Sequence, residues 1–106
     1  RRAKVVGDAQ SNARALSMML EARRADVGLY PVGTYNWTAS GTVPTASKNP
    51  APGFAPPTGK GATMSYQLVV NAGGVSYNLT VTSIEYAGKN VLTMDQNGAM
   101  HTMLQD

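Results

Sequence analysis

The chain has 106 residues, of which 42% are hydrophobic and 14% are charged, and it contains no cysteine. This length suits one domain with one core, and the hydrophobic fraction excludes a disordered chain. The charged fraction lies well below the usual quarter of a soluble domain. We therefore expect a surface that meets neighbouring molecules over much of its area. The absence of cysteine excludes a disulfide framework and leaves the cellular compartment open.

Residues 1–27 are expected to form a long amphipathic helix, with its regular part over about residues 3–25. Apolar residues recur there at steps of three and four, which places them in one narrow stripe along a helix. Gly28 is a plausible C-cap, and Pro31 cannot lie inside a helix. The sequence begins abruptly inside this pattern, so we expect that more helix precedes it. The candidate packing stripe, for the core or for a filament, consists of Val6, Ala9, Ala13, Leu16 and Leu20.

Residues 28–61 change character and are expected to form a long irregular loop. They contain all six prolines and six of the glycines, and no hydrophobic period is apparent in them. A loop of this length in a compact domain is unusual and is often functional. Large aromatic side chains should attach it to the body of the domain, namely Tyr30, Tyr35, Trp37 and Phe54.

Residues 62–106 are expected to form a four-stranded antiparallel sheet. In its first half, apolar and polar residues alternate on both sides of Gly73-Gly74, which predicts a hairpin with a two-residue turn. This turn sets a register in which the apolar side chains share one face. The predicted cross-strand pairs are Val70 with Tyr77, Leu68 with Leu79, and Tyr66 with Val81.

The second half of this region predicts another hairpin, with residues 91–96 and 99–104 flanking Asn97-Gly98. Asn-Gly is a preferred pair for a type I′ turn. Leu92 and Met94 would then lie opposite Met103 and His101. With the helix covering the apolar face, residues 1–106 make a single α+β domain of two layers.

The order of these parts resembles the type IV pilin and pseudopilin family, whose members have a long N-terminal helix, a variable αβ-loop and an antiparallel sheet. Residues 1–31 resemble the exposed half of the family's helix, and Leu29-Tyr30-Pro31 resembles the segment that leaves it. The run VSYNLTVTSIEY, residues 75–86, resembles a central strand. The run VLTMDQNGAM, residues 91–100, resembles the closing strand and its turn.

This resemblance implies a structural subunit, a major or minor pilin of a bacterial type IV pilus or a related filament. Its partners would be other pilins, and its place the bacterial cell surface. Before assembly a hydrophobic half-helix upstream of residue 1 would hold it in the inner membrane, with this domain in the periplasm. The alternative is a DNA- or surface-binding minor pilin or pseudopilin at a filament tip or in a secretion system. Twitching, adhesion, secretion and DNA uptake in natural transformation all stay open.

Nothing in the sequence indicates an enzyme, a cofactor, a metal or a small-molecule substrate. His101 is the only histidine, and no Gly-x-Ser-x-Gly motif occurs. The segment after Asp95 faintly resembles a calcium loop, but Met100 stands where such a loop requires glycine. The glycosylation-type triplets at Asn36 and Asn78 are interpreted as chance matches.

The basic residues gather at the start of the chain, where residues 1–24 hold six basic and two acidic side chains. They could meet lipid phosphates or help to hold DNA on a filament. The simpler interpretation, which we favour, is a solvated helix face. Lys48 and Lys60 accompany the loop aromatics, a mixture that can also bind single strands, although attachment of the loop is the preferred role of the aromatics. The candidate phosphate contacts are Arg1, Arg2, Lys4, Arg23, Arg24, Lys48 and Lys60.

Overall fold

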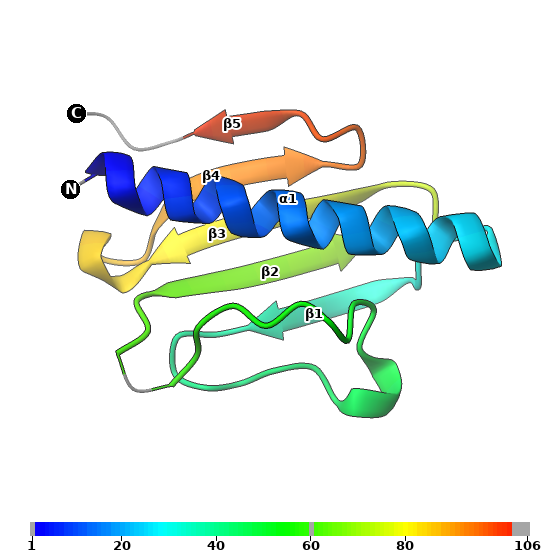
Figure 1. The fold of residues 1–106 in the computed structure, drawn as a ribbon, viewed down its shortest axis with the longest axis horizontal. Helices are drawn as coiled ribbons and strands as arrows, with labels where there is room; N and C mark the ends of the chain where they lie inside the picture. The colour runs from blue at the N-terminus through cyan, green and yellow to red at the C-terminus, as the bar shows by residue number, and fades with distance from the viewer. Residues whose placement is uncertain (1, 60, 103–106) are drawn as a thin grey trace.

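A computed structural model describes residues 2–59 and 61–102, apart from the side chain of Arg2. It is an α+β domain in which one long helix lies on one face of an antiparallel sheet (Figure 1). The sheet has five strands in the order β1-β2-β3-β4-β5, one more strand than expected. The elements are α1 (Arg2–Val27), β1 (Gly33–Trp37), β2 (Met64–Val70), β3 (Tyr77–Ser83), β4 (Lys89–Asp95) and β5 (Met100–Thr102), with short 3₁₀ turns at Ala46–Lys48 and Ile84–Tyr86.

The additional strand β1 corrects the expectation that residues 28–61 are irregular throughout. β1 pairs antiparallel with β2, so that Tyr35 lies opposite Leu68 and Trp37 opposite Tyr66. Aromatic residues at alternate positions suit a pleated surface with one covered face. The αβ-loop proper is therefore residues 38–63, and it starts from the sheet and not from the helix.

Helix α1 buries a stripe close to the predicted one. Ala9, Ala13, Leu16 and Leu20 have no exposed surface. At the N-terminal end Val5 is the deeply buried residue, while Val6 is only partly buried. Val5 precedes Ala13 by eight residues, which is two steps of four. In a helix with 3.6 residues per turn this spacing keeps Val5 on the same side as the rest of the stripe. In Figure 1 the helix runs across the middle strands of the sheet.

The hairpin of β2 and β3 has the predicted register, with Val70 opposite Tyr77, Leu68 opposite Leu79 and Tyr66 opposite Val81. All six of these side chains are buried. The turn is longer than two residues, because the last backbone hydrogen bond, from Asn71 N to Ser76 O at 3.0 Å, encloses residues 72–75. Val75 consequently leaves the alternating pattern and is 52% exposed.

The second hairpin is shifted by one residue from its prediction. Met94 lies opposite Met100, not His101, and Leu92 lies opposite Thr102; Met103 falls outside the described residues. The loop has three residues because Asp95 N donates to Ala99 O at 3.2 Å, and Gly98 has a positive φ of 78°. The Asp95 carboxylate accepts hydrogen bonds from the backbone N–H groups of Asn97 and Ala99 at 2.9 and 3.2 Å. These bonds favour a three-residue turn with a glycine bulge over a type I′ turn.

The αβ-loop lies on the helix side of the sheet and covers the part over β1 (Figure 1). Phe54 packs edge-on against Trp37 and Tyr66, with ring centroids 5.0 and 5.7 Å away. Tyr30 packs edge-on against Tyr77 at 5.1 Å. Such aromatic pairs add to the burial of apolar area. Helix and loop together therefore close one face of the sheet and leave the other face free.

Candidate functional site

The free side of the sheet, which we call the outer face, is polar and almost uncharged. Along each strand the side chains between the buried ones point to this side. The register then aligns Asn36, Gln67, Thr80 and Thr93 in one row across four strands. A second row contains Ser65, Thr82 and Asn90. The outer face includes Asn36, Ser65, Gln67, Thr80, Thr82, Asn90 and Thr93.

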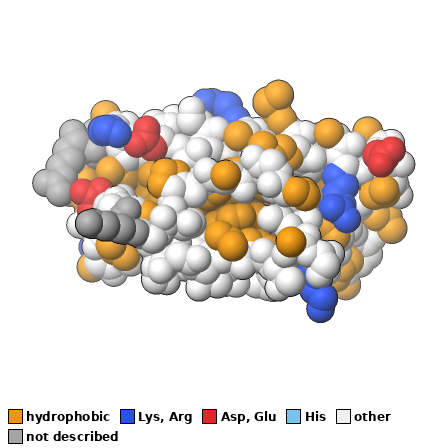
Figure 2. Space-filling model, turned by 60° about the horizontal axis from the view of Figure 1, so that its bottom comes forward, with side chains coloured by type: hydrophobic (Ala, Val, Ile, Leu, Met, Phe, Trp, Pro, Cys, Tyr) orange, Lys and Arg blue, Asp and Glu red, His pale blue; other side chains and the backbone are white. Residues whose placement is uncertain are grey.

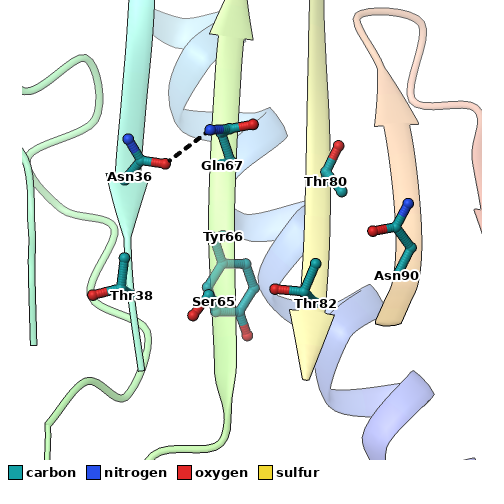
Figure 3. A pocket seen from close by; sticks show the side chains of 8 residues that line it. All are labelled: Asn36, Thr38, Ser65, Tyr66, Gln67, Thr80, Thr82 and Asn90. Atoms are coloured by element: carbon teal, nitrogen blue, oxygen red, sulfur yellow. Dashed lines mark hydrogen bonds between the residues drawn. The ribbon is translucent and has the colours of Figure 1, made fainter. Parts of the chain in front are cut away.

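A shallow groove of about 300 Å³ lies on the outer face between β1 and β4. Figure 3 shows Asn36, Gln67, Thr80, Thr82 and Asn90 in front of the strands, with the helix behind. A bulge between Val81 and Thr82 shifts the pairing of β3 with β4, so that Thr82 faces Asn90. A bulge bends its strand locally and re-aims the side chains next to it. Among the described residues, those that line the groove include no lysine, arginine, aspartate or glutamate.

Part of the groove is held by internal hydrogen bonds. Gln67 Nε2 donates to Asn36 Oδ1 at 3.2 Å, and Ser65 Oγ accepts from the backbone N–H of Ala39 at 2.9 Å. Thr80, Thr82 and Asn90 make no side-chain hydrogen bond to any other residue that the structure describes. Their donors and acceptors, together with Gln67 Oε1 and Asn36 Nδ2, are turned to solvent.

The basic candidates that the structure describes do not all meet at one place, because Lys4 lies near the start of α1 while Arg23 and Arg24 lie near its end. Lys4 forms an exposed ion pair with Asp8 at 2.9 Å. Arg23 Nη1 donates to Asn49 O at 3.5 Å, and the Arg24 guanidinium lies 5.0 Å from the centre of the Tyr30 ring. Lys48 belongs to the 3₁₀ turn of the αβ-loop. The side chains of Arg1, Arg2 and Lys60 lie outside the described part of the chain.

Two of the loop aromatics, Trp37 and Phe54, pack in the core, and this excludes them as a platform for bases, whereas Tyr35 is only partly buried. Trp37 is 1% exposed and Phe54 is 5% exposed. Neither ring can stack on a nucleotide without opening the domain, so attachment of the loop is their role. Figure 2, with the side of β1 and the αβ-loop turned forward, shows only a few Lys, Arg, Asp and Glu side chains among neutral ones.

Exposed aliphatic side chains gather where helix α1 ends, and we call them the end patch. The turn between β2 and β3 contacts this region, because Tyr30 N donates to Gly74 O at 2.9 Å and Leu29 lies beside Gly74. Exposed patches of this kind mark contact surfaces when they are larger than single scattered residues. The end patch consists of Val27, Leu29, Val32 and Val75, which are each 52–60% exposed.

Polar side chains under the helix join it to the sheet. Asn12 Nδ2 donates to Tyr66 Oη at 2.7 Å, and Tyr77 Oη lies 3.4 Å from Ser17 Oγ. The Tyr30 hydroxyl donates to the Glu21 carboxylate. Burial raises the pKa of the tyrosines at 30, 66 and 77 above the ordinary value, and the Glu21 hydrogen bond raises that of Tyr30 further. These groups connect the two layers.

Among the residues that the structure describes, no group of three or more His, Cys, Asp or Glu residues is placed so that it could hold a metal ion. No described helix has both the length and the apolar character that crossing a bilayer demands.

Comparisons with protein-family models, curated proteins and solved structures give no match for this chain. The fold and its surfaces define a two-layer α+β domain with a single long helix, an aliphatic end patch and a neutral polar sheet face.

The outer face is the surface that the sequence analysis did not single out. Its signal was present in the alternation itself, because the residues between the apolar ones in β2 and β3 are, apart from Val69, Ser, Gln, Asn and Thr. The alternation locates the core, and the chemistry of these positions, amides and hydroxyls without charge, indicates the neutral outer face.

Proposed function

We propose that this chain is the globular domain of a filament subunit of the type IV pilin class. The observation that carries the proposal is one 26-residue helix lying along one face of an antiparallel sheet, in the chain order helix, β1, loop and β2 to β5. Apart from β1, which precedes the loop, this is the arrangement that the sequence resemblance implies for a pilin. The assembled subunit would place α1 towards the filament axis and the sheet towards solvent.

The side of α1 that faces away from the sheet supports this orientation. Met18 on that side is 73% exposed, and the end patch extends the apolar surface beyond the end of the helix. Apolar and methionine side chains that lie outside a core adapt well to a partner surface. We therefore assign these residues to contacts between subunits in the filament.

The work of the subunit would be mechanical. A low charged fraction of 14% suits a chain with neighbours on several sides, because charged residues are depleted in the centres of interfaces. Subunits would be made as membrane-held precursors and would meet other pilins at the base of the filament. A role in twitching, adhesion, secretion or DNA uptake would follow from the rest of the apparatus.

The proposal requires a hydrophobic helical segment directly before Arg1 in the whole gene product. We expect a run of about 20 apolar residues there, the length that spans a bilayer. Reading the upstream coding sequence tests this. A second soluble domain fused at that point would contradict the proposal.

Cross-linking in cells tests the orientation. The chain has no cysteine, so single cysteines can be introduced cleanly into the full-length protein. Met18→Cys should give a covalent dimer with a short bis-maleimide in sheared surface material, because each subunit carries one thiol. Thr93→Cys on the outer face should instead react with a bulky maleimide on intact filaments and give no dimer. A dimer from Thr93→Cys alone, or no dimer from either variant, would contradict the proposed packing.

A further inference from the structure

The groove on the outer face has the composition of a ligand site and not that of a structural surface alone. Its side chains are amides and hydroxyls, each of which can both donate and accept hydrogen bonds. Thr80, Thr82 and Asn90 keep this capacity unused within the described structure. The groove of about 300 Å³ is hollowed where the β-bulge moves Thr82 opposite Asn90.

The absence of charge in the groove selects the class of ligand. Phosphate and sulfate groups require lysine, arginine or converging backbone N–H groups, and metal ions require carboxylates or imidazoles. The residues lining the groove include none of these side chains within the described chain. A ligand that matches it must itself be neutral and rich in hydroxyl or amide groups.

A second copy of this chain matches the groove less well. Centres of protein interfaces are built around aromatic, methionine and arginine anchors. Val69 is the apolar side chain on the described outer positions of β2, and it lies between Gln67 and the turn. The large apolar residues that are exposed in the described chain are Met18, Val43, Ile84 and the end patch, and none of them lines the groove.

We propose that the outer-face groove between β1 and β4 binds neutral carbohydrate. Sugar hydroxyls act as donor and acceptor at once, as do the amides of Asn36, Gln67 and Asn90 and the hydroxyls of Thr80 and Thr82. Adjacent strands are about 4.8 Å apart, so neighbouring side chains across the groove can contact neighbouring hydroxyls of one sugar chain. The proposal does not depend on filament assembly, because the groove belongs to a single domain.

The affinity of one groove should be in the millimolar range. No exposed aromatic ring lies among the described lining residues to stack on a sugar face, since Tyr66 is buried and bonded to Asn12. Each neutral hydrogen bond has to replace one made with water, which leaves a small net gain. If the domain does repeat along a filament, many such grooves would act together through avidity.

NMR titration of the ¹⁵N-labelled domain tests the proposal. The probes are linear oligosaccharides of glucose and of N-acetylglucosamine, with a sulfated oligosaccharide as the charged control. We expect shifts confined to β1–β4 and to the side-chain amides of Asn36, Gln67 and Asn90. The binding should be insensitive to salt, because no ion pairs are involved.

A matched pair of variants locates the site. Thr80→Val with Thr82→Val removes two hydroxyls while keeping the branched shape that strands favour, and it should weaken binding at least fivefold. Ser11→Ala with Thr45→Val also removes two hydroxyls, from the exposed side of α1 and from the αβ-loop, and should leave binding unchanged. The amide spectrum of each variant shows whether it is folded.

Three results would overturn the proposal. The first is no shift with any neutral oligosaccharide at saturating concentration. The second is binding that the control variant weakens as much as the groove variant does, or that occurs only with the sulfated probe and disappears with salt. The third is self-association through the outer face in the absence of sugar, which would make a second copy the occupant. The cross-linking of Met18→Cys is independent of all three.

Discussion

The two faces of the sheet are formed by the same strands, yet they differ in almost every physical property. The inner face of β2 and β3 presents Tyr66, Leu68, Leu79 and Val81, each at most 1% exposed. The outer face of the same strands presents Ser65, Gln67, Thr80 and Thr82, none of which is buried. Since successive side chains alternate in direction, one residue of shift along a strand exchanges the two environments.

The difference teaches where stability and recognition reside in this domain. The inner face is covered by α1 and the αβ-loop, so its side chains contribute the burial that holds the fold together. Nothing in the described part of the chain covers the outer face, and changes on it should cost little stability. Binding to other molecules can therefore vary on the outer face while the inner face keeps the fold.

The largest expected effect comes from the inner side. Leu16 has no exposed surface in the contact of α1 with the sheet, and Leu16→Ala should lower the free energy of unfolding by about 2–5 kcal/mol. Met18 lies on the same helix but is 73% exposed, so Met18→Ala should change it by less than about 0.5 kcal/mol. Urea unfolding of the two variants measures both values. Equal losses would show that α1 does not pack as described.

A second effect comes from the turn between β2 and β3, which contacts the segment that follows α1. A Cβ atom at Gly74 would lie 2.7 Å from the carbonyl oxygen of Tyr30, and φ is 70° there. At Gly73, φ is 96°, but no atom lies within 4 Å of the place that an added Cβ atom would occupy. Both substitutions to alanine strain the backbone, but only Gly74→Ala adds a clash.

Gly74→Ala should therefore be less stable than Gly73→Ala by about 1–3 kcal/mol, the usual cost of overpacking. The comparison of the two variants in urea cancels the shared backbone strain. If Gly73→Ala were the less stable of the two, the contact of this turn with Tyr30 would be wrong.

A third effect is the response of the inner face to alkaline pH. Burial raises the pKa of Tyr66 and of Tyr77 above their ordinary value of 10.0, and the hydrogen bonds of Tyr66 with Asn12 and of Tyr77 with Ser17 offset this in part. A group with a raised pKa in the folded state loses its proton more readily when unfolded. The stability that it contributes is fully present below pH 10 and is lost as the pH rises further.

We therefore expect the urea midpoint to fall as the pH rises above about 10. Replacing both tyrosines with phenylalanine should make this fall shallower, although it costs stability at neutral pH by leaving the Asn12 amide without its partner. The slope against pH is the quantity to compare. An unchanged slope would show that these hydroxyls do not titrate differently in the two states.

The sequence predicted the inner face better than the rest of the molecule. Hydrophobic periodicity predicts the helix, the register of β2 with β3 and the burial of Ala9, Ala13, Leu16 and Leu20. It does so because buried positions recur at the period of a helix or a strand. Strand β1 was missed because its five residues lie among glycines and prolines, and its only signal is Tyr35 and Trp37 two positions apart.

The remaining differences arise from interactions that a pattern does not encode. The β4–β5 register depends on the Asp95 carboxylate, which stabilises a three-residue loop where Asn-Gly predicted two. The groove depends on a bulge at Val81 and Thr82, and the residue types at these positions do not predict a bulge. Its neutral character could have been predicted from the outer positions of β2 and β3 alone.

The smallest expected effect concerns DNA, and it compares the charged helix side with the neutral sheet side. Lys4 and Arg23 are 19 positions apart on α1, or about 28 Å at 1.5 Å per residue. Lys4 is paired with Asp8 and Arg24 lies over Tyr30, so few cations can reach one stretch of phosphates together. Because affinity grows with the number of phosphates neutralised, duplex DNA should bind at about 10⁻⁴–10⁻⁶ M or more weakly at physiological salt.

Fluorescence anisotropy with a labelled duplex measures this affinity. Arg23→Gln with Arg24→Gln should weaken the binding only slightly, and Thr80→Val with Thr82→Val should have no effect on it. Nanomolar binding that the double arginine substitution abolished would instead make the helix side of this domain a receptor surface for DNA.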